Sequence, residues 1–193
     1  APQLTVERVD ITTDDVNKVS EWEVDVLINN AAAGETGPMA DVPLDRVRRL
    51  FEVNVFGKLA VTQQVLKGMV ARGSGRVIIV SSIAGVVAGQ TIGPYAMTKH
   101  ALEAMGKAMR AELAPQGIDV TLLNPGPYQT GFNERMAGSM WEWFGEEALG
   151  ILRICRLGGS DDRRFPALQE RGQLRQRLFE SGEVFFPVER PPR

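Results

Sequence analysis

Three side chains between residues 82 and 99 have the types and spacing that proton transfer to an oxygen atom requires. Ser82 follows an apolar run, Tyr95 comes thirteen residues later, and Lys99 lies four residues beyond Tyr95. Residues i and i+4 share one face of a helix, so the ammonium of Lys99 can lie beside the phenol of Tyr95. A cation about 5 Å away, at an effective dielectric of about 20, lowers a phenol pKa from roughly 10 towards 8. The spacing therefore predicts a tyrosine that exchanges a proton near neutral pH, whereas the alternative is an exposed helix pair.

The composition predicts one globular domain that binds neither nucleic acid nor a membrane surface. The chain has 193 residues, of which 44% are hydrophobic, and a net charge of −2. This charge gives no basic field for nucleic acid, and no apolar run approaches the ~20 residues that span a bilayer. The single cysteine, Cys155, cannot form an internal disulfide, which favours a reducing cytoplasm. His100 stands alone and no Cys/His cluster accompanies it, so we expect a helix-surface or interface histidine and no metal site.

Alternating apolar strands and amphipathic helices predict an α/β fold with a parallel sheet. A short polar helix is expected over 14–21, and the two long helices are separated from the strands by Gly- or Pro-containing turns. Compact β-branched runs indicate strands that are buried on both faces. The predicted strands are Leu4–Val9, Val24–Ile28, Arg76–Val80 and Ile118–Leu123, and the predicted long helices are Leu44–Met69 and Pro94–Leu113.

Polar residues follow each predicted strand at the point where the strand ends. Asp10, Asn29, Ser82 and Asn124 occupy these positions. Open α/β sheets bind ligands outside the carboxyl ends of their strands. We therefore expect these four side chains to gather along one rim of the sheet.

These motifs, in this order and spacing, resemble those of the short-chain dehydrogenase/reductase family in its single-domain form. The resemblance runs from about Leu4 to Thr130 and implies a three-layer, doubly wound Rossmann-like sheet. The matching residues are Asp10, the turn Asn29-Asn30-Ala31, Asn54, Ser82, the pair Tyr95 and Lys99, Pro125-Gly126 and Thr130.

The resemblance implies hydride transfer between NAD or NADP and a carbonyl or alcohol substrate. It assigns Tyr95 as general acid/base, Lys99 as the cation that lowers its pKa and binds the nicotinamide ribose, Ser82 as the group that holds the substrate oxygen, and Asn54 as the support of a proton-relaying water chain. A developing negative charge on oxygen suits hydroxyl donors beside a lysine. The cofactor-binding residues implied are Asp10, Ile11, Asn29, Ala31, Tyr95, Lys99, Pro125, Gly126 and Thr130.

The chain departs from the family pattern at its start. Family members open with a strand and a Gly-rich turn that cradles the pyrophosphate, and neither occurs here. About 45–50 residues of the family pattern, a βαβα portion, are missing, so we expect upstream residues in the native polypeptide. The choice between NAD and NADP is made in that portion. Ala32 also stands where the family usually has glycine.

Two alternative functions follow from these departures. The missing cradle allows a truncated or silent relative that acts as a scaffold or regulatory subunit. A cofactor-free dehalogenase on the same scaffold is disfavoured, because such enzymes carry arginine at the position of Lys99.

The segment after the last rim turn is rich in large apolar residues, among them Phe132, Trp141 and Trp143. We expect a Rossmann-type domain over 1–157 whose segment 131–157 is a lid for a bulky apolar substrate; a subunit interface or ordinary core is the alternative. Residues 158–193 are expected to form a charged, partly helical extension with a flexible tail. Family analogy also suggests a homodimer or homotetramer formed through the two long helices.

Overall fold

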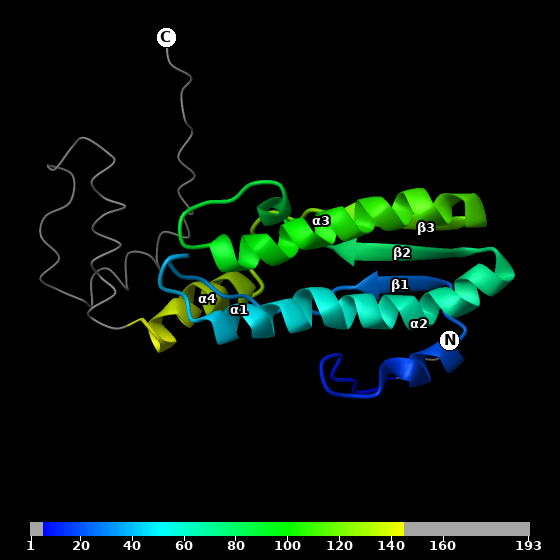
Figure 1. Ribbon diagram of the computed structural model, residues 1–193, viewed down its shortest axis with the longest axis horizontal. Helices are drawn as coiled ribbons and strands as arrows, with labels where there is room; N and C mark the ends of the chain where they lie inside the picture. Colours follow the sequence, from blue (N-terminus) through cyan, green and yellow to red (C-terminus); the bar gives the residue numbers. More distant parts are fainter. Residues whose placement is uncertain (1–5, 145–193) are drawn as a thin grey trace, which may run out of the picture.

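The computed structural model describes residues 6–144 of the chain. These residues form a parallel β-sheet with long helices packed against it (Figure 1). Cys155, the lid positions after 144 and the extension over 158–193 lie outside the described residues. The principal elements are β1 (Val26–Asn29), α1 (Leu44–Phe51), α2 (Gly57–Arg72), β2 (Gly75–Val80), α3 (Gly93–Leu113), β3 (Ile118–Leu123) and α4 (Phe132–Ser139).

The sheet has the strand order β1-β2-β3, and all neighbouring strands are parallel. Leu27 of β1 lies opposite Val77 of β2, which in turn lies opposite Val120 of β3. Because the strands are parallel, their carboxyl ends meet at one edge of the sheet. The predicted α/β fold with a parallel sheet is confirmed.

The hydrophobic core lies between the sheet and the two long helices. Helix α3 approaches β3 closely, because a Cβ atom at Gly106 would lie 2.7 Å from Cδ2 of Leu122. Burial of these apolar side chains provides most of the free energy that holds the helices on the sheet. The buried core residues are Val19, Val65, Met69, Val77, Ile79, Leu102, Met109, Leu113, Ile118 and Val120.

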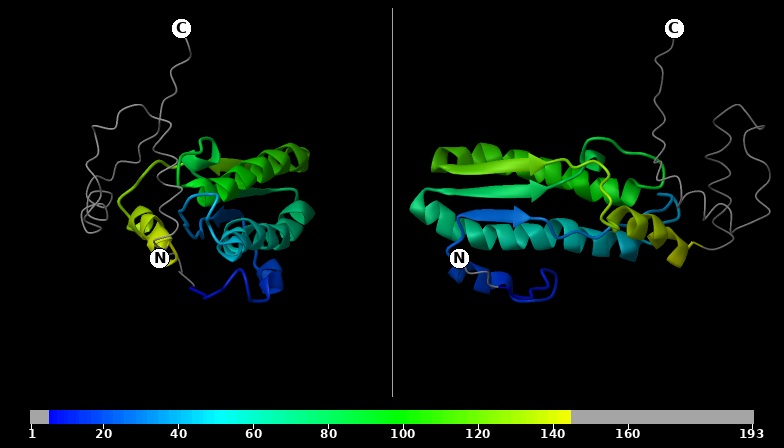
Figure 2. Two further views of the ribbon diagram at one scale, coloured as in Figure 1. Left: turned by 60° about the vertical axis from the view of Figure 1, so that its left-hand side comes forward. Right: turned by 180° about the vertical axis from the view of Figure 1, so that it is seen from behind.

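The two faces of the sheet differ in exposure, which corrects one prediction. Helices α2 and α3 cover one face, whereas the view from behind in Figure 2 looks directly onto the strands. Val26 and Ile28 are 50% and 59% exposed, and Leu123 on β3 is 45% exposed. The prediction that the strand over Val24–Ile28 is buried on both faces was therefore wrong for the described residues. Alternate residues of β1 point away from α2, and no described helix covers them.

The segment before β1 also differs from its prediction. Residues 6–10 have no regular structure, and Val6 is 82% exposed, so the predicted strand over Leu4–Val9 is not formed at its described positions. A strand requires a hydrogen-bonding neighbour, and none of the three described strands pairs with this segment. The predicted short helix is a 3₁₀ helix, η1 (Val16–Glu21), capped by Asp15 and packed beneath α2 (Figure 1).

The predicted long helix from Leu44 is present, and it contains a local irregularity. Helix α1 continues through a π-helical turn, Glu52–Phe56, directly into α2, so helical structure extends to Arg72. The backbone N–H of Gly57 bonds to the carbonyl of Glu52, five residues earlier. Such turns insert one extra residue into a helix and are frequent at functional sites. Asn54 lies at the centre of this turn.

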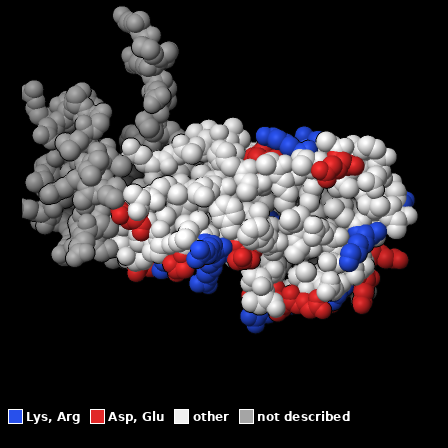
Figure 3. Space-filling model, viewed as in Figure 1, with Lys and Arg blue, Asp and Glu red and all other residues white. Residues whose placement is uncertain are grey.

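Acidic and basic side chains are interspersed on the face viewed in Figure 3. The ion pairs found between described residues include Arg76 with Asp119 and Arg46 with Glu142. None of the helices among residues 6–144 has the length and apolar character needed to cross a lipid bilayer.

Candidate active site

The ends of β2 and β3 are joined by polar contacts at the carboxyl edge of the sheet. The backbone N–H of Ser81 donates to the carbonyl of Leu123 at 2.8 Å, and that of Ile83 donates to the carbonyl of Pro125 at 3.1 Å. Asn124 donates from its side-chain amide to the backbone carbonyl of Ser82 at 3.0 Å. The expectation that the turns after these two strands share one rim is therefore met for Ser82 and Asn124.

Helix α3 brings Tyr95 and Lys99 to the same edge. Lys99 Nζ lies 5.3 Å from the centroid of the Tyr95 ring, as their spacing on one helix face predicts. Both side chains are buried, at 7% and 2% exposure. Lys99 donates to the backbone carbonyl of Val80 at 3.0 Å, which fixes the ammonium at the end of β2.

Ser82 lies at the end of β2, close to the phenol of Tyr95. Its hydroxyl accepts a hydrogen bond from the N–H of Ala84 at 3.1 Å and caps a short 3₁₀ turn, Ile83–Gly85. The same hydroxyl interacts with the Tyr95 phenol. The structure thus brings Ser82, Tyr95 and Lys99 together, as their types and spacing predicted.

The pKa of Tyr95 does not shift in the expected direction. Burial raises the pKa of the phenol above its ordinary value, and the interaction with the Ser82 hydroxyl only partly offsets this. Lys99 is itself perturbed: burial, followed by the charge of Lys58, lowers its pKa to about 7. The expectation that Lys99 produces a net lowering is therefore corrected. A buried ammonium that is only partly charged at neutral pH cannot outweigh the loss of water around the phenol.

Asn54 fixes the turn after β1 to helix α3. Its side-chain oxygen accepts from the N–H of Ala33 at 2.8 Å, and its side-chain amide donates to the carbonyl of Ala33 at 2.9 Å and to Oγ1 of Thr98 at 3.0 Å. Thr98 Oγ1 in turn donates to the backbone carbonyl of Tyr95 at 2.8 Å. With its side chain fully engaged and 0% exposed, Asn54 determines how the loop after β1 faces the first turn of α3.

Asn29 and Ala31, at the end of β1 and in the turn after it, differ in burial. Asn29 is buried and donates to Oγ1 of Thr62 at 2.7 Å, so its side chain ties β1 to α2. Ala31, two residues further along, is exposed. Asn29 is therefore a structural anchor in the described contacts, whereas Ala31 is open to a ligand.

Three of the remaining predicted cofactor residues lie in the loop after β3. Pro125 and Gly126 follow β3, and a Cβ atom at Gly126 would contact Cδ1 of Ile83 at 3.3 Å. Thr130, further along this loop, is exposed.

Asp10 and Ile11 lie in the segment before η1. The Asp10 carboxylate accepts from the backbone N–H and hydroxyl of Thr12, and these hydrogen bonds lower its pKa. Ile11 packs against Gly57 at the start of α2. None of the side-chain hydrogen bonds found for Asp10 within 6–144 reaches the residues around Tyr95.

Helix α4 and the following 3₁₀ turn η5 (Met140–Glu142) lie beyond the carboxyl ends of the strands, next to α1 (Figures 1 and 2). The ring of Phe132, the first residue of α4, lies 5.9 Å from that of Tyr95, centroid to centroid. Thr36 anchors α4 to the loop after β1: its N–H donates to Ser139 Oγ and its hydroxyl to the carbonyl of Met136, both at 2.9 Å.

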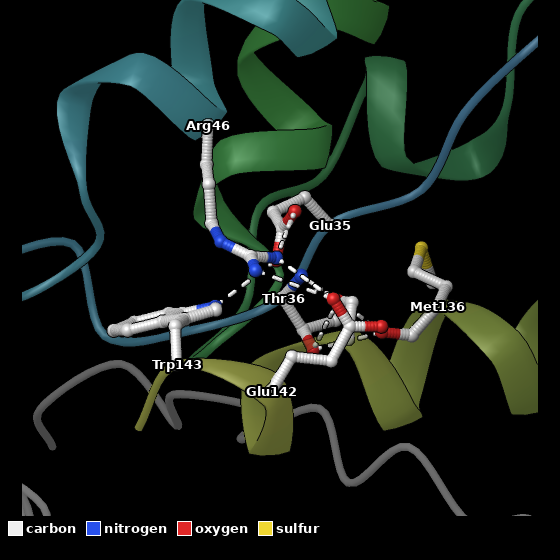
Figure 4. Close-up of polar contacts among 7 residues, drawn as sticks. Glu35, Thr36, Arg46, Met136, Glu142 and Trp143 are labelled. Carbon is white, nitrogen blue, oxygen red and sulfur yellow. Dashed lines mark hydrogen bonds and ion pairs between the residues drawn. The ribbon is translucent and has the colours of Figure 1, made fainter. Parts of the chain in front are cut away.

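A buried carboxylate strengthens this attachment (Figure 4). Glu35 accepts from the indole N–H of Trp143 at 3.1 Å and forms an ion pair with Arg46 at 3.3 Å. Arg46 also pairs with Glu142 at 3.2 Å. Gly37 leaves room for the indole, because a Cβ atom there would collide with the Trp143 ring. The segment 34–37 therefore docks α4 and η5 beside the Tyr95 site.

Sequence reasoning missed two buried titratable residues, Lys58 and Glu103. Lys58 is 1% exposed and Glu103 is 7% exposed. Both belong to lines of buried polar residues at i, i+4 and i+8, where an amphipathic helix should carry apolar side chains. That interruption of the apolar face is the signal that could have identified them. One line consists of Asn54 in the π-helical turn with Lys58 and Thr62 of α2, and the other of Tyr95, Lys99 and Glu103 on α3.

Comparison with known proteins identifies the family. A family model described as short chain dehydrogenase matches residues 5–140. The chain is 39% identical over 127 residues to an NADPH-dependent 3-dehydrocapnine reductase from Ornithobacterium rhinotracheale, covering 63% of this chain and 45% of that protein. It is 36% identical over 122 residues to the Homo sapiens 17-beta-hydroxysteroid dehydrogenase type 1, covering 63% and 37%. The chain thus spans less than half the length of these two curated relatives.

A solved structure gives the same result. A gluconate 5-dehydrogenase from Burkholderia cenocepacia, in complex with NADP and tartrate, superposes with a TM-score of 0.63 at 33% identity, over 69% of this chain and 56% of that one. This superposition matches the parallel sheet and its flanking helices. The chain therefore belongs to the short-chain dehydrogenase/reductase family of oxidoreductases.

Proposed function

We propose that the polypeptide containing this chain is an NAD(P)-dependent oxidoreductase that interconverts a ketone or aldehyde and an alcohol. The observation that carries the proposal is the meeting of Tyr95, Lys99 and Ser82 at the carboxyl edge of the sheet. A buried phenol, a hydroxyl and an ammonium at this edge are the groups that hydride transfer at a carbonyl carbon requires.

In the reduction direction, the phenol of Tyr95 gives its proton to the substrate oxygen as negative charge develops there. In oxidation the phenolate accepts that proton. Ser82 holds the same oxygen through its hydroxyl, and Lys99, when charged, stabilises the phenolate. Because burial raises the pKa of the phenol, Tyr95 is held as a proton donor at neutral pH.

The donors at this edge suit the nicotinamide half of an NAD(P) cofactor. The Lys99 ammonium lies 5.3 Å from the centroid of the Tyr95 ring, so the ammonium and the phenol can both donate to ribose hydroxyls, and the Pro125–Gly126 turn lies at the same edge. When bound, the cofactor supplies or accepts the hydride. We assign Ala31 and Thr130 to this cofactor site as exposed contacts, and Asp10 and Ile11 to its adenine end.

We further propose that the substrate is bulky and apolar, with α4 and η5 as its lid. Phe132 packs beside the Tyr95 ring, and Trp143 and Phe144 form an aromatic pair with centroids 5.6 Å apart. The similarity to a hydroxysteroid dehydrogenase supports an apolar substrate. The homodimer or homotetramer expected through the long helices stays a prediction, which the mass of the native particle tests.

The proposal is tested with Tyr95→Phe in the full-length polypeptide. This change removes the proton donor and leaves the ring in place, so turnover of carbonyl substrates with NADH and NADPH should fall by about 10²-fold or more. Circular dichroism should remain that of the parent. Tyr128→Phe, at the other tyrosine of the chain, which is 68% exposed, is the matched control and should keep parental turnover.

A titration of cofactor fluorescence separates the oxidoreductase from a silent scaffold. Saturable quenching or enhancement of NADH or NADPH fluorescence, retained in Tyr95→Phe, is expected. Parental turnover in a folded Tyr95→Phe protein would overturn the assignment of Tyr95. Failure of the parent to bind either nucleotide would overturn the proposed activity as a whole.

A further inference from the structure

Lys58 is a buried cation whose contacts among the described residues include no acidic partner. Its side chain is 1% exposed, and within residues 6–144 the one acceptor found for its ammonium is the backbone carbonyl of Val80, at 3.4 Å. The ion pairs found within 6–144 do not include Lys58. Burial of an ammonium without a compensating charge is unfavourable. Lys58 therefore stabilises the packing of α2 less than a buried apolar residue of its size would.

The acceptor of Lys58 is the acceptor of Lys99 as well. Lys99 Nζ donates to the same Val80 carbonyl at 3.0 Å. Because both nitrogens contact one oxygen, at 3.4 and 3.0 Å, they lie within about 6.4 Å of each other. Two ammonium groups this close, and both shielded from water, interact strongly.

We propose that Lys58 is a positioning residue of the Tyr95 site: Lys58 and Lys99 form a coupled pair on the Val80 carbonyl, in which Lys58 sets the pH range over which Lys99 carries its charge. The role of this pair in catalysis rests on the proposed function. Its electrostatic part stands on the two buried lysines alone.

The groups that face this pair leave it without a neutralising charge among the described residues. On α3 these are Tyr95, beside Lys99, and Glu103, one turn further on, whose carboxylate bonds to Asn124. β2 contributes the uncharged Val80 carbonyl. From β1, the Asn29 amide bonds to Oγ1 of Thr62, one turn beyond Lys58 on α2, and carries no charge.

The segment before η1 completes the surroundings. It meets α2 next to Lys58 through the apolar contact of Ile11 with Gly57. Asp10 is exposed and bonded to Thr12, and Asp14 is exposed and accepts from the N–H of Asp10. The ion pairs found within 6–144 include neither Lys58 nor Lys99, and the two ammonium groups share the Val80 carbonyl.

The direction of the coupling follows from these positions. Burial lowers the pKa of Lys58 to about 8, and burial together with the charge of Lys58 lowers the pKa of Lys99 to about 7. Interacting groups of this kind lose their protons in two coupled steps. Removal of the Lys58 charge must raise the pKa of Lys99, so that Lys99 stays charged to higher pH.

The test follows the lysine protons directly in the full-length polypeptide, without cofactor or substrate. Side-chain ¹³C NMR of labelled lysine resolves the titration of each residue. The five lysines of this chain are assigned by single Lys→Met variants. In the parent, the Lys99 signal should titrate near pH 7. In Lys58→Met it should titrate about one pH unit higher.

Matched variants make the result specific. Lys67→Met removes an exposed lysine from the same helix and should leave the Lys99 midpoint unchanged. Lys58→Arg keeps the charge and should also leave it depressed. Lys58→Leu provides a second neutral replacement if Lys58→Met does not fold. An unchanged Lys99 midpoint in a folded neutral variant would overturn the coupling.

The kinetic consequence is tested separately. If Tyr95 and Lys99 act as proposed, the alkaline limb of the kcat/KM profile should move up by about one pH unit in Lys58→Met. A parent without oxidoreductase activity, combined with the NMR shift, would refute the proposed function and retain the lysine pair. A parental kcat/KM profile in a variant whose Lys99 midpoint has shifted would overturn the positioning role.

Discussion

Glu103 accepts a 2.6 Å hydrogen bond from the side-chain amide of Asn124, and the same amide donates to the backbone carbonyl of Ser82 at 3.0 Å. The carboxylate belongs to α3, one turn after Lys99, so the helix that carries Tyr95 also holds the residue that fixes the strand end at Ser82. The relative position of the two hydroxyls that would contact a substrate oxygen therefore depends on this link.

Loss of the link should affect turnover more than binding. In Glu103→Ala, Asn124 loses its acceptor and Ser82 its fixed position, so we expect kcat to fall by about tenfold with little change in KM. Glu103→Gln keeps an acceptor oxygen for Asn124 and should restore most of kcat. Steady-state kinetics of both variants checks this expectation. Equal losses in the two variants would mean that the charge, and not the hydrogen bond, is what matters.

The same carboxylate should make stability depend on pH. Burial raises the pKa of Glu103, but hydrogen bonds from Asn124 and Ser81 and the charge of Lys107 outweigh it, so the net pKa is lowered. A lowered pKa contributes stability above the unfolded value of about 4.3, and this contribution is lost as the pH falls through the folded value. The difference in unfolding free energy between the parent and Glu103→Gln should therefore be larger at about pH 7 than at about pH 3.

Urea denaturation at the two pH values measures this difference. Glu112→Gln, an exposed position on the same helix, is the control and should show little difference at either pH. A Glu103→Gln difference that does not shrink in acid would contradict the assigned direction.

Asn54 should be the most sensitive polar position of the fold. Asn54→Ala leaves the N–H and the carbonyl of Ala33 without their hydrogen-bond partner. Because Asn54 is 0% exposed, solvent does not reach the site to replace those bonds, so we expect the free energy of unfolding to fall by about 3 kcal/mol. Chemical denaturation of the full-length protein measures it. Asn30→Ala, at an exposed asparagine of the loop after β1 that contains Ala33, should change stability by no more than about 0.5 kcal/mol.

Gly37 should control the attachment of the segment that follows β3. Its φ is +155°, a conformation that strains any residue with a Cβ atom, and the added methyl group would meet the Trp143 ring. Gly37→Ala should therefore release the indole and shift its fluorescence towards that of a solvent-exposed tryptophan. Trp143→Phe identifies the contribution of this residue among the three tryptophans of the chain.

The matched control for this change is Gly138→Ala in α4, where an added Cβ meets no atom within 4 Å. Its emission should be that of the parent. A folded Gly37→Ala protein with parental emission would show that the loop shifts without releasing the indole.

The local parts of this architecture could be predicted from the sequence. Apolar periodicity located both long helices, and the runs at Arg76–Val80 and Ile118–Leu123 were recognised as strands. Tyr95 and Lys99 were placed together because four residues on a helix bring two side chains to one face. These predictions use spacing within one element, which the sequence displays directly.

The remaining parts depend on contacts between elements that are distant in sequence. Asn54 meets Thr98 across 44 residues, and Lys58 and Lys99 converge on Val80 from two helices. The direction of the Tyr95 pKa shift was missed for the same reason, since it depends on burial by other elements. The strand expected over 4–9 failed because pairing requires a neighbour, which propensity cannot supply.

The π-turn at Glu52–Phe56 sets the rotational phase between two halves of one continuous helix. Each residue of an α-helix advances the side-chain direction by about 100°, so one inserted residue rotates everything after it by about that angle. In the structure Asn54 faces Ala33 and Thr98, whereas Lys58 contacts the end of β2 and Thr62 contacts β1. The wider π-turn accommodates one extra residue, so a single-residue deletion within it should keep these contacts on the same sides, whereas a deletion in the regular part of α2 would turn everything after it by about 100°.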